Sequence, residues 1–198
     1  MRYRYICLIG ICFMILLRCE VQNGTDISNG KINELINSGW EQFEAGNYSI
    51  GLQKFEEAIS QDETSAEAYC GAGWCYARLT DLSAAVLNFN EAISINASLL
   101  DAHAGLAFVY YAQKQYSPAI SSANKTLSLS SVYLFGHDRR IDYKDLYLVI
   151  AACYFALGDF NQSLAFVKKL NPSFTADLAT FDGKSALAEE IERLRGIV

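Results

Sequence analysis

Helical periodicity runs through most of this chain. Stretches containing Ala, Leu, Glu and Lys recur with a helical period, whereas strand-like blocks of alternating Val, Ile and Thr are missing. The only two prolines are Pro118 and Pro172. Apolar residues every three to four positions are typical of amphipathic helices, and alternation at every second position is typical of strands. The pattern therefore predicts an all-α protein without a sheet.

The helical pattern recurs every 34 residues. Three consecutive segments, 32–65, 66–99 and 100–133, align without a gap, and a fourth copy, 144–172, follows an insertion, 134–143. A period of this length indicates stacked supersecondary units, because one unit alone cannot bury its own apolar face.

Small and large residues alternate at fixed positions of each copy. The eighth position holds only glycine or alanine: Gly39, Gly73, Ala107 and Ala151. The twentieth position is small as well: Gly51, Ala85, Ala119 and Ser163. Phe55 and Phe89 occupy the twenty-fourth position of the first two copies. Antiparallel helices approach closely only where no bulky side chain intervenes, and large residues fill the remaining space. Each copy is thus expected to form a close pair of helices, A and B.

The turn within each copy can also be identified. Four dipeptides occupy the same two positions: Gly46-Asn47, Thr80-Asp81, Lys114-Gln115 and Gly158-Asp159. Glycine at the first position supplies the left-handed backbone that ends helix A, and asparagine or aspartate at the second caps helix B. Pro172 comes three residues early in the fourth copy, so the second helix of that copy is expected to end about one turn short.

This pattern resembles the tetratricopeptide repeat family from roughly Ile32 to Pro172. The family has small residues at positions eight, twenty and twenty-seven and aromatic residues at eleven and twenty-four, and most of these recur here. The family's tryptophan at position four is replaced: Leu35, Tyr69, His103 and Tyr147. The usual proline at position thirty-two is absent. The resemblance implies a right-handed solenoid of four helix-turn-helix repeats whose A helices line a concave groove.

The last segment, 173–198, is predicted to close the stack. An apolar stripe recurs in it at helical spacing: Leu187, Ile191, Leu194 and Val198. Glu189 and Arg193 lie on the opposite side as an i, i+4 pair. An amphipathic helix of this kind caps the open end of a solenoid, where the terminal repeat would otherwise expose its apolar face.

The first eighteen residues, 1–18, differ from the repeats. Basic residues precede an uncharged and mostly apolar run, 6–17, which has the length of a signal-peptide core and is too short to cross a bilayer. Leu16-Leu17-Arg18-Cys19 resembles a bacterial lipobox, in which the cysteine receives a diacylglycerol and becomes the mature N-terminus. Arg18 departs from that pattern, because a small residue is usual there.

A lipoprotein-like signal peptide in 1–18 and lipidation of Cys19 are therefore the favoured interpretation. An uncleaved or otherwise cleaved signal is the alternative. The polar segment 19–31 is expected to be a flexible tether. An anchored protein would lie at a membrane of the bacterial cell envelope and face the periplasm or the cell surface.

Charge and motifs argue against several function classes. The formal net charge is −6, so a nucleic-acid ligand is not expected, because such binding needs a basic surface that displaces counterions. The chain has no P-loop and no GxSxG, HExxH or EF-hand motif. We therefore expect no enzyme activity, no cofactor, no metal site and no small-molecule substrate.

The cysteines and histidines of the repeats are expected to be structural. Three cysteines form an odd set without CxxC spacing, typical of buried thiols: Cys70, Cys75 and Cys153. His103 is expected in the helix-packing core. His137 lies in the polar run 136–142, which is expected to be a solvated connecting loop, with a partner contact as the alternative. A loop between two helices does not by itself provide the desolvated pocket that a general base needs.

The resemblance places the candidate binding site on the A helices. Family positions nine, twelve and thirteen face the groove, and the candidate residues there are mostly aromatic: Trp40, Phe43, Trp74, Arg78, Phe108, Tyr111 and Phe155. Aromatic residues and arginine are common in binding hot spots. Gly71 and Gly105, at position six, are expected to leave the groove floor open. The alternative is that the rings pack against neighbouring A helices or under the C-terminal segment.

Two functions follow from this reading. The first is an exported adaptor that binds a peptide or helix of a partner protein in the groove, resembling repeat lipoproteins that help assemble outer-membrane or pilus complexes. The second is a structural subunit of an envelope complex whose convex face or insertion makes the contacts. A groove that clamps chaperone C-terminal carboxylates is not expected, because position two is mostly acidic: Asn33, Glu67, Asp101 and Asp145.

Overall fold

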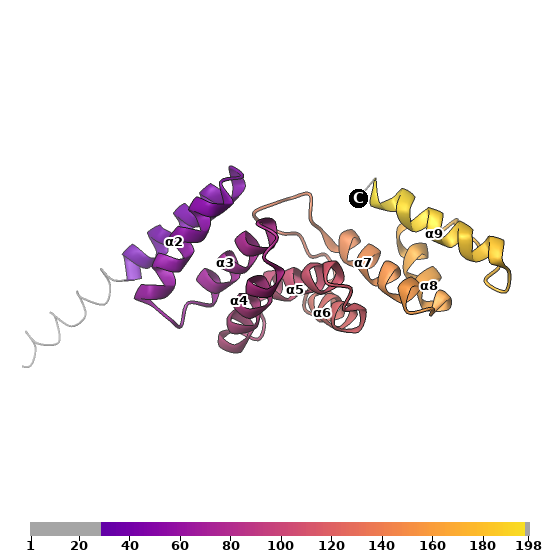
Figure 1. The fold of residues 1–198 in the computed structure, drawn as a ribbon, viewed down its shortest axis with the longest axis horizontal. Coiled ribbons are helices and arrows are strands. Elements are labelled where there is room, and N and C mark those ends of the chain that lie inside the picture. The colour runs from indigo at the N-terminus through magenta and orange to yellow at the C-terminus, as the bar shows by residue number, and fades with distance from the viewer. Residues whose placement is uncertain (1–28, 197–198) are drawn as a thin grey trace, which may run out of the picture.

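The computed structural model describes residues 29–196, and within them every regular element is a helix. The described part of the first helix covers residues 29–44. The following helices are α2 (Tyr48–Gln61), α3 (Ala66–Arg78), α4 (Leu82–Ile95), α5 (Leu100–Ala112), α6 (Tyr116–Leu129), α7 (Tyr143–Ala156), α8 (Phe160–Leu170) and α9 (Phe181–Arg195). Successive helices pair along an arched array, and α9 lies beside α8 at the C-terminal end (Figure 1). The all-α prediction is confirmed.

The turn inside each helix pair has the backbone that the sequence predicts. The first residue of each turn dipeptide has a positive φ: 80° at Gly46, 66° at Thr80, 59° at Lys114 and 80° at Gly158. Non-glycine residues rarely adopt this conformation, so its recurrence at Thr80 and Lys114 shows that the turn geometry overrides the preference of the residue.

The helix caps follow the prediction at the aspartates only. Asp81 and Asp159 accept hydrogen bonds from backbone N–H groups in the first turns of α4 and α8. Asn47 makes no such bond; its Nδ2 donates instead to Gln42 Oε1. The predicted cap is therefore wrong at Asn47, whose side chain is engaged by the preceding helix.

The position-six glycines make room for phenylalanine rings in the core. Phe55 and Phe89 are fully buried. A Cβ atom added at Gly71 would overlap the Phe55 ring, and one added at Gly105 would overlap the Phe89 ring. The expectation that these glycines leave the groove floor open is therefore wrong. They let each B-helix phenylalanine approach the next A helix closely.

The buried sulfur and imidazole groups behave as expected. The three described cysteines are unpaired and buried: Cys70, Cys75 and Cys153. His103 is 9% exposed, and its Nε2 lies 3.0 Å from the Ala97 carbonyl oxygen. Both groups are structural parts of the helix packing, in agreement with the sequence prediction.

The C-terminal end of the array is closed by α9. Helix α8 has 11 residues, whereas α2, α4 and α6 have 14 each, so the shortening predicted from Pro172 is confirmed. The apolar side of α9, with Leu187, Ile191 and Leu194, is buried against α7 and α8. This confirms the capping helix.

The ion pair on α9 differs from the prediction. Arg193 binds Glu190 at i, i+3, with Nε 2.7 Å from Oε2, rather than Glu189. Glu190 also accepts a hydrogen bond from Asn171 Nδ2 at 2.9 Å. The pairing with Glu189 was wrong because Glu190, not Glu189, faces the end of α8.

Several sequence predictions fall outside the described residues. The signal peptide 1–18, Cys19 and most of the tether 19–31 are among them, as is Val198. Within residues 29–196, no helix is long and apolar enough to cross a bilayer.

Candidate functional site

The insertion between α6 and α7 forms a narrow hairpin. Phe135 N–H donates to the Ile141 carbonyl, and Tyr143 N–H donates to the Tyr133 carbonyl, each at 2.9 Å. Leu134 and Asp142 form the intervening antiparallel bridge. Because consecutive residues of an extended segment face opposite sides, Tyr133 and Phe135 are buried while Leu134 is half exposed.

The buried side of the hairpin fills the N-terminal part of the groove. The Phe135 ring stacks on Trp74, with centroids 4.3 Å apart and planes inclined by 20°. It also meets the edges of Trp40 and Phe43, each with a centroid separation of 6.0 Å. Phe135 is therefore the apolar anchor of the insertion on the first two repeats.

A buried polar contact fixes the start of the hairpin. Tyr133 O–H donates to Asp101 Oδ1 at 2.9 Å, and Trp74 Nε1 donates to the Asp101 carbonyl oxygen at 3.1 Å. Burial raises the pKa of both Tyr133 and Asp101. Asp101, at position two of its repeat, thus binds the hairpin of its own chain.

The polar tip of the insertion contacts the first two A helices. The His137 ring is parallel to Trp40 at 3.8 Å, and its Nδ1 lies 2.8 Å from Glu44 Oε1. The Asp138 carboxylate accepts hydrogen bonds from Arg78 and Arg140 at 2.8 Å, and the bonds from Arg140 lower its pKa.

The expectation of a solvated connecting loop is therefore wrong for the inner side of the insertion. The Asp138 side chain is only 11% exposed and the inner side of the hairpin lies on aromatic rings, whereas Arg140 is 84% exposed. The sequence did contain a signal for this, because Val-Tyr-Leu-Phe before Gly136 is a continuous run of β-branched, aliphatic and aromatic residues, which is typical of a buried extended segment.

Three of the seven predicted groove residues are buried. Trp40, Phe43 and Trp74 are 3–5% exposed, so they are unavailable to a partner in this structure. They pack against side chains of neighbouring A helices, as the alternative interpretation expected, but the segment that covers them is the hairpin and not the C-terminal segment.

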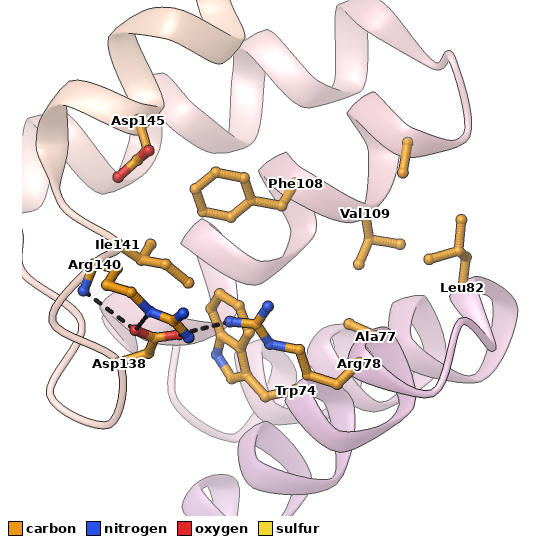
Figure 2. Close-up of a pocket in the computed structure, with 11 residues that line it drawn as sticks. Trp74, Ala77, Arg78, Leu82, Phe108, Val109, Asp138, Arg140, Ile141 and Asp145 are labelled. Carbon is orange, nitrogen blue, oxygen red and sulfur yellow. Dashed lines mark hydrogen bonds and ion pairs between the residues drawn. The ribbon is translucent and has the colours of Figure 1, made fainter. Parts of the chain in front are cut away.

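Arg78 and Phe108 remain accessible beside the hairpin. They border a cavity of about 440 Å³ between α3, α5, the hairpin and α7. Figure 2 shows the Asp138 carboxylate between the guanidinium groups of Arg78 and Arg140, with Phe108 across the cavity. The cavity thus combines an apolar floor with a charged edge.

Asp145 lies at the same cavity but has a structural partner. Its Oδ2 accepts the Asp142 backbone N–H at 2.8 Å, which completes the N-terminal cap of α7. Burial raises the pKa of Asp145. Like Asp101, this position-two acid stabilises its own chain.

Tyr111 and Phe155 border a second cavity, of about 480 Å³, beside α9. Both side chains are half-buried. Arg195 on α9 donates a hydrogen bond to the Tyr111 hydroxyl at 2.6 Å, and its guanidinium lies 5.9 Å from the centre of that ring. Phe108 and Tyr111 are three residues apart on α5, so this helix borders both cavities.

The buried thiols are poor nucleophiles. Burial raises the pKa of Cys75 and of Cys153 to about 12, so both stay protonated at neutral pH. Within residues 29–196, no three His, Cys, Asp or Glu side chains are grouped closely enough to hold a metal ion.

Comparisons with known proteins identify the architecture. Residues 66–99 match the family model described as tetratricopeptide repeat, and these are the residues assigned to the second copy by spacing. The chain superposes on the crystal structure of MamA with a TM-score of 0.61 at 18% identity, covering 88% of this chain and 86% of that one. No curated protein matches the chain by sequence.

Two further solved structures have the same fold. TTC0263, a thermophilic TPR protein of Thermus thermophilus, has a TM-score of 0.58 at 18% identity, with 82% of each chain covered. The first TPR of Spaghetti (RPAP3), bound to the HSP90 peptide SRMEEVD, has a TM-score of 0.57 at 17% identity, covering 65% of this chain and 94% of that one. The fold is therefore a tetratricopeptide solenoid with a C-terminal capping helix.

Proposed function

We propose that this chain is a non-enzymatic protein-binding module that holds a peptide or helix of a partner against α5. The observation that supports this is the pair of cavities bordered by α5, where Phe108, Tyr111 and Phe155 remain half-buried. Aromatic side chains that are neither covered nor fully solvated are suited to serve as hot spots.

The proposed site is centred on the rings of α5 rather than on the two tryptophans, of which only Trp74, itself 3% exposed, borders one of the cavities. A partner that used Trp40 or Trp74 would first have to displace Phe135 and Tyr133, which are 0% and 2% exposed. Re-exposing two buried aromatic side chains costs several kcal/mol, which an interface of modest size would have to supply. Binding beside the hairpin avoids that cost.

The lining favours a partner with apolar side chains. Three cations border the two cavities, and each already binds an acid: Arg78 and Arg140 bind Asp138, and Arg195 binds Glu192. The RPAP3 domain was solved with an acidic HSP90 peptide; at 17% identity that likeness concerns the fold. Here an acidic ligand would meet Asp145 at the first cavity and Glu189 and Glu192 at the second, so we do not expect the same ligand.

The test compares cavity variants for partner affinity and stability. After the partner is captured from the native host, Phe108→Ala or Tyr111→Ala should weaken its binding by about 2 kcal/mol or more. Leu87→Ala is the matched control, because Leu87 lies on α4 and is 71% exposed; it should leave affinity unchanged. If Leu87→Ala weakens binding and the cavity variants do not, the convex face is the interface and the chain is a structural subunit.

We also propose that the module is exported and anchored by a lipid at Cys19. The support is the apolar leader followed by Leu16-Leu17-Arg18-Cys19. In the native host, Cys19→Ser should abolish incorporation of labelled fatty acid and release the protein from the membrane fraction. Cys70→Ser is the control and should retain both the fatty-acid label and the membrane association. A wild-type protein that is unlabelled and unanchored contradicts this part of the proposal without affecting the cavity proposal.

A further inference from the structure

The outer edge of the insertion hairpin carries unpaired backbone groups. The residues on either side of Leu134 make the bonds to the returning strand, Tyr133 through its carbonyl and Phe135 through its N–H. In an antiparallel pair the intervening residue directs its N–H and C=O to the opposite edge. Within residues 29–196, neither group of Leu134 has a hydrogen-bond partner.

The side chains at this edge are apolar and exposed. Val132 is 74% exposed and Leu134 is 50% exposed. The segment 130–136 contains no charged residue and no proline. Edge strands are usually protected by lysine, proline or a bulge, and an unprotected apolar edge is a template for another strand.

A cavity of about 560 Å³ lies beside this edge. Residues 132–134 and Gly136 form one side, and the connection from α4 to α5 together with the start of α5, including Leu99 and Leu100, forms the other. Asp101 is the one ionisable acid or base that lines it apart from the Tyr133 phenol, and its carboxylate already accepts the Tyr133 hydroxyl. The space is therefore suited to an extended chain with apolar side chains and no acidic group on the inner side.

We infer that this edge binds an extended, apolar segment of a partner protein by strand addition. The main chain of the segment bonds to the N–H and C=O of Leu134, and alternate side chains enter the cavity beside Leu99 and Leu100. This site is separate from the two cavities at α5, and it does not depend on them.

The occupant is a partner segment rather than a second copy of this chain. Antiparallel pairing of two copies would place Leu134 opposite Leu134 and Val132 opposite Gly136. Each copy would also bring its own wall of residues 96–101, which lies directly beside the edge. A space of about 560 Å³ suits a single extended chain, whereas it is too small for a second hairpin together with its wall.

The experiment follows backbone amide signals of the isotope-labelled full chain during titration with a short capped peptide of alternating threonine and valine. We expect the signals of Leu134 and Gly136 to shift while that of Phe108 stays in place. Leu134→Pro removes the outward N–H but leaves the bonds of Phe135 and Tyr143 intact, and it should weaken binding by about tenfold or more. Leu134→Val keeps both the N–H and an apolar side chain and should bind like the wild type.

Two additional measurements separate strand addition from other outcomes. The same peptide with every residue N-methylated has no main-chain N–H to donate and should not bind. Val132→Glu places a charge at the edge and should reduce binding even if Leu134→Pro fails to fold. No shift at Leu134, an equal response to the methylated peptide, or self-association of the wild type that Val132→Glu abolishes would each overturn the inference.

Discussion

Side chains at equivalent repeat positions differ in exposure between the two ends of the concave surface. At the N-terminal end, Trp40 and Trp74 occupy position nine and are 5% and 3% exposed beneath the hairpin. In the third repeat the same position holds Phe108, which is half-buried and borders a cavity. The repeat position sets the direction of a side chain, whereas the segment that covers it decides its exposure.

The covering segments also differ in how they attach. The hairpin inserts the rings of Tyr133 and Phe135 among the A helices. Helix α9 instead reaches the groove through the edge of its apolar side and through Arg195, which binds the Tyr111 hydroxyl. We therefore expect large stability effects beneath the hairpin and small ones beside α9.

The largest expected effect is that of Trp74→Ala. This change removes a buried indole that stacks on Phe135 and bonds to the Asp101 carbonyl. It should lower the free energy of unfolding by roughly 3–5 kcal/mol, as for other buried aromatic residues. Urea unfolding followed by circular dichroism measures the loss.

Phe108→Ala is the matched variant at the same position of the next repeat. Because Phe108 is half-buried, Phe108→Ala should lower the free energy of unfolding by less than half as much as Trp74→Ala does. Equal losses at the two positions would contradict the difference between the two ends of the groove.

Gly71→Ala should have the next largest effect. The added Cβ would overlap the Phe55 ring, which is fully buried, and overpacking of this kind costs about 1–3 kcal/mol. The helix propensity of alanine would recover at most about 1 kcal/mol. Thermal unfolding should show a lower Tm for Gly71→Ala, whereas Gly136→Ala, with open space around it, should change the Tm little. A stabilised Gly71→Ala would show that the ring can move away.

Asp138→Asn should produce a smaller effect that depends on pH. Hydrogen bonds from Arg140 hold the pKa of Asp138 below its ordinary value of 3.8. A carboxyl with a lowered pKa stabilises the fold above that value and loses this contribution as the pH falls through its folded pKa. The variant should thus be less stable than the wild type by at most about 1 kcal/mol at neutral pH, and the difference should shrink below pH 3.8.

Unfolding at a series of pH values measures this difference. Burial raises the pKa of Asp101 and Asp145, so these two carboxyls change stability with pH in the sense opposite to Asp138. Both are present in the wild type and in the variant, so their contributions cancel when the two proteins are compared. A stability difference between wild type and variant that stays constant from neutral to acid pH would mean that the carboxylate charge does not hold the hairpin.

The repeat architecture could be predicted because its signals are local. The left-handed turn residues, the small eighth position and the early Pro172 each act within one helix pair, and the helices and turns follow them. The role of Gly71 was missed because its neighbour Phe55 lies in the preceding repeat, beyond the pattern of a single helix face.

The candidate site was less predictable because it depends on contacts between distant segments. Phe135 meets Trp40 across a separation of 95 positions in the sequence, and no periodicity describes such a contact. The apolar run before Gly136 indicated a buried segment, but not which surface would bury it. The repeat positions thus predicted in which direction each side chain points, but not whether that side chain is exposed.

The smallest expected effect is that of Arg195→Met, at the end of the groove covered by α9. Arg195 bonds to the Tyr111 hydroxyl at 2.6 Å and to Glu192 at 2.9 Å, but its side chain is 46% exposed. Exposed pairs contribute about 0–1 kcal/mol, and methionine keeps much of the apolar stem. The free energy of unfolding should therefore fall by less than about 1 kcal/mol.

The same variant tests whether α9 controls access to Tyr111. Without the arginine, the Tyr111 hydroxyl loses its partner on α9, so the ring should become more accessible to tyrosine-modifying reagents while the fold persists. Glu189→Gln, also beside this cavity, is the control and should leave Tyr111 reactivity unchanged. A stability loss as large as that of Trp74→Ala would place Arg195 in the core of the cap, and the two ends of the groove would then be attached in the same way.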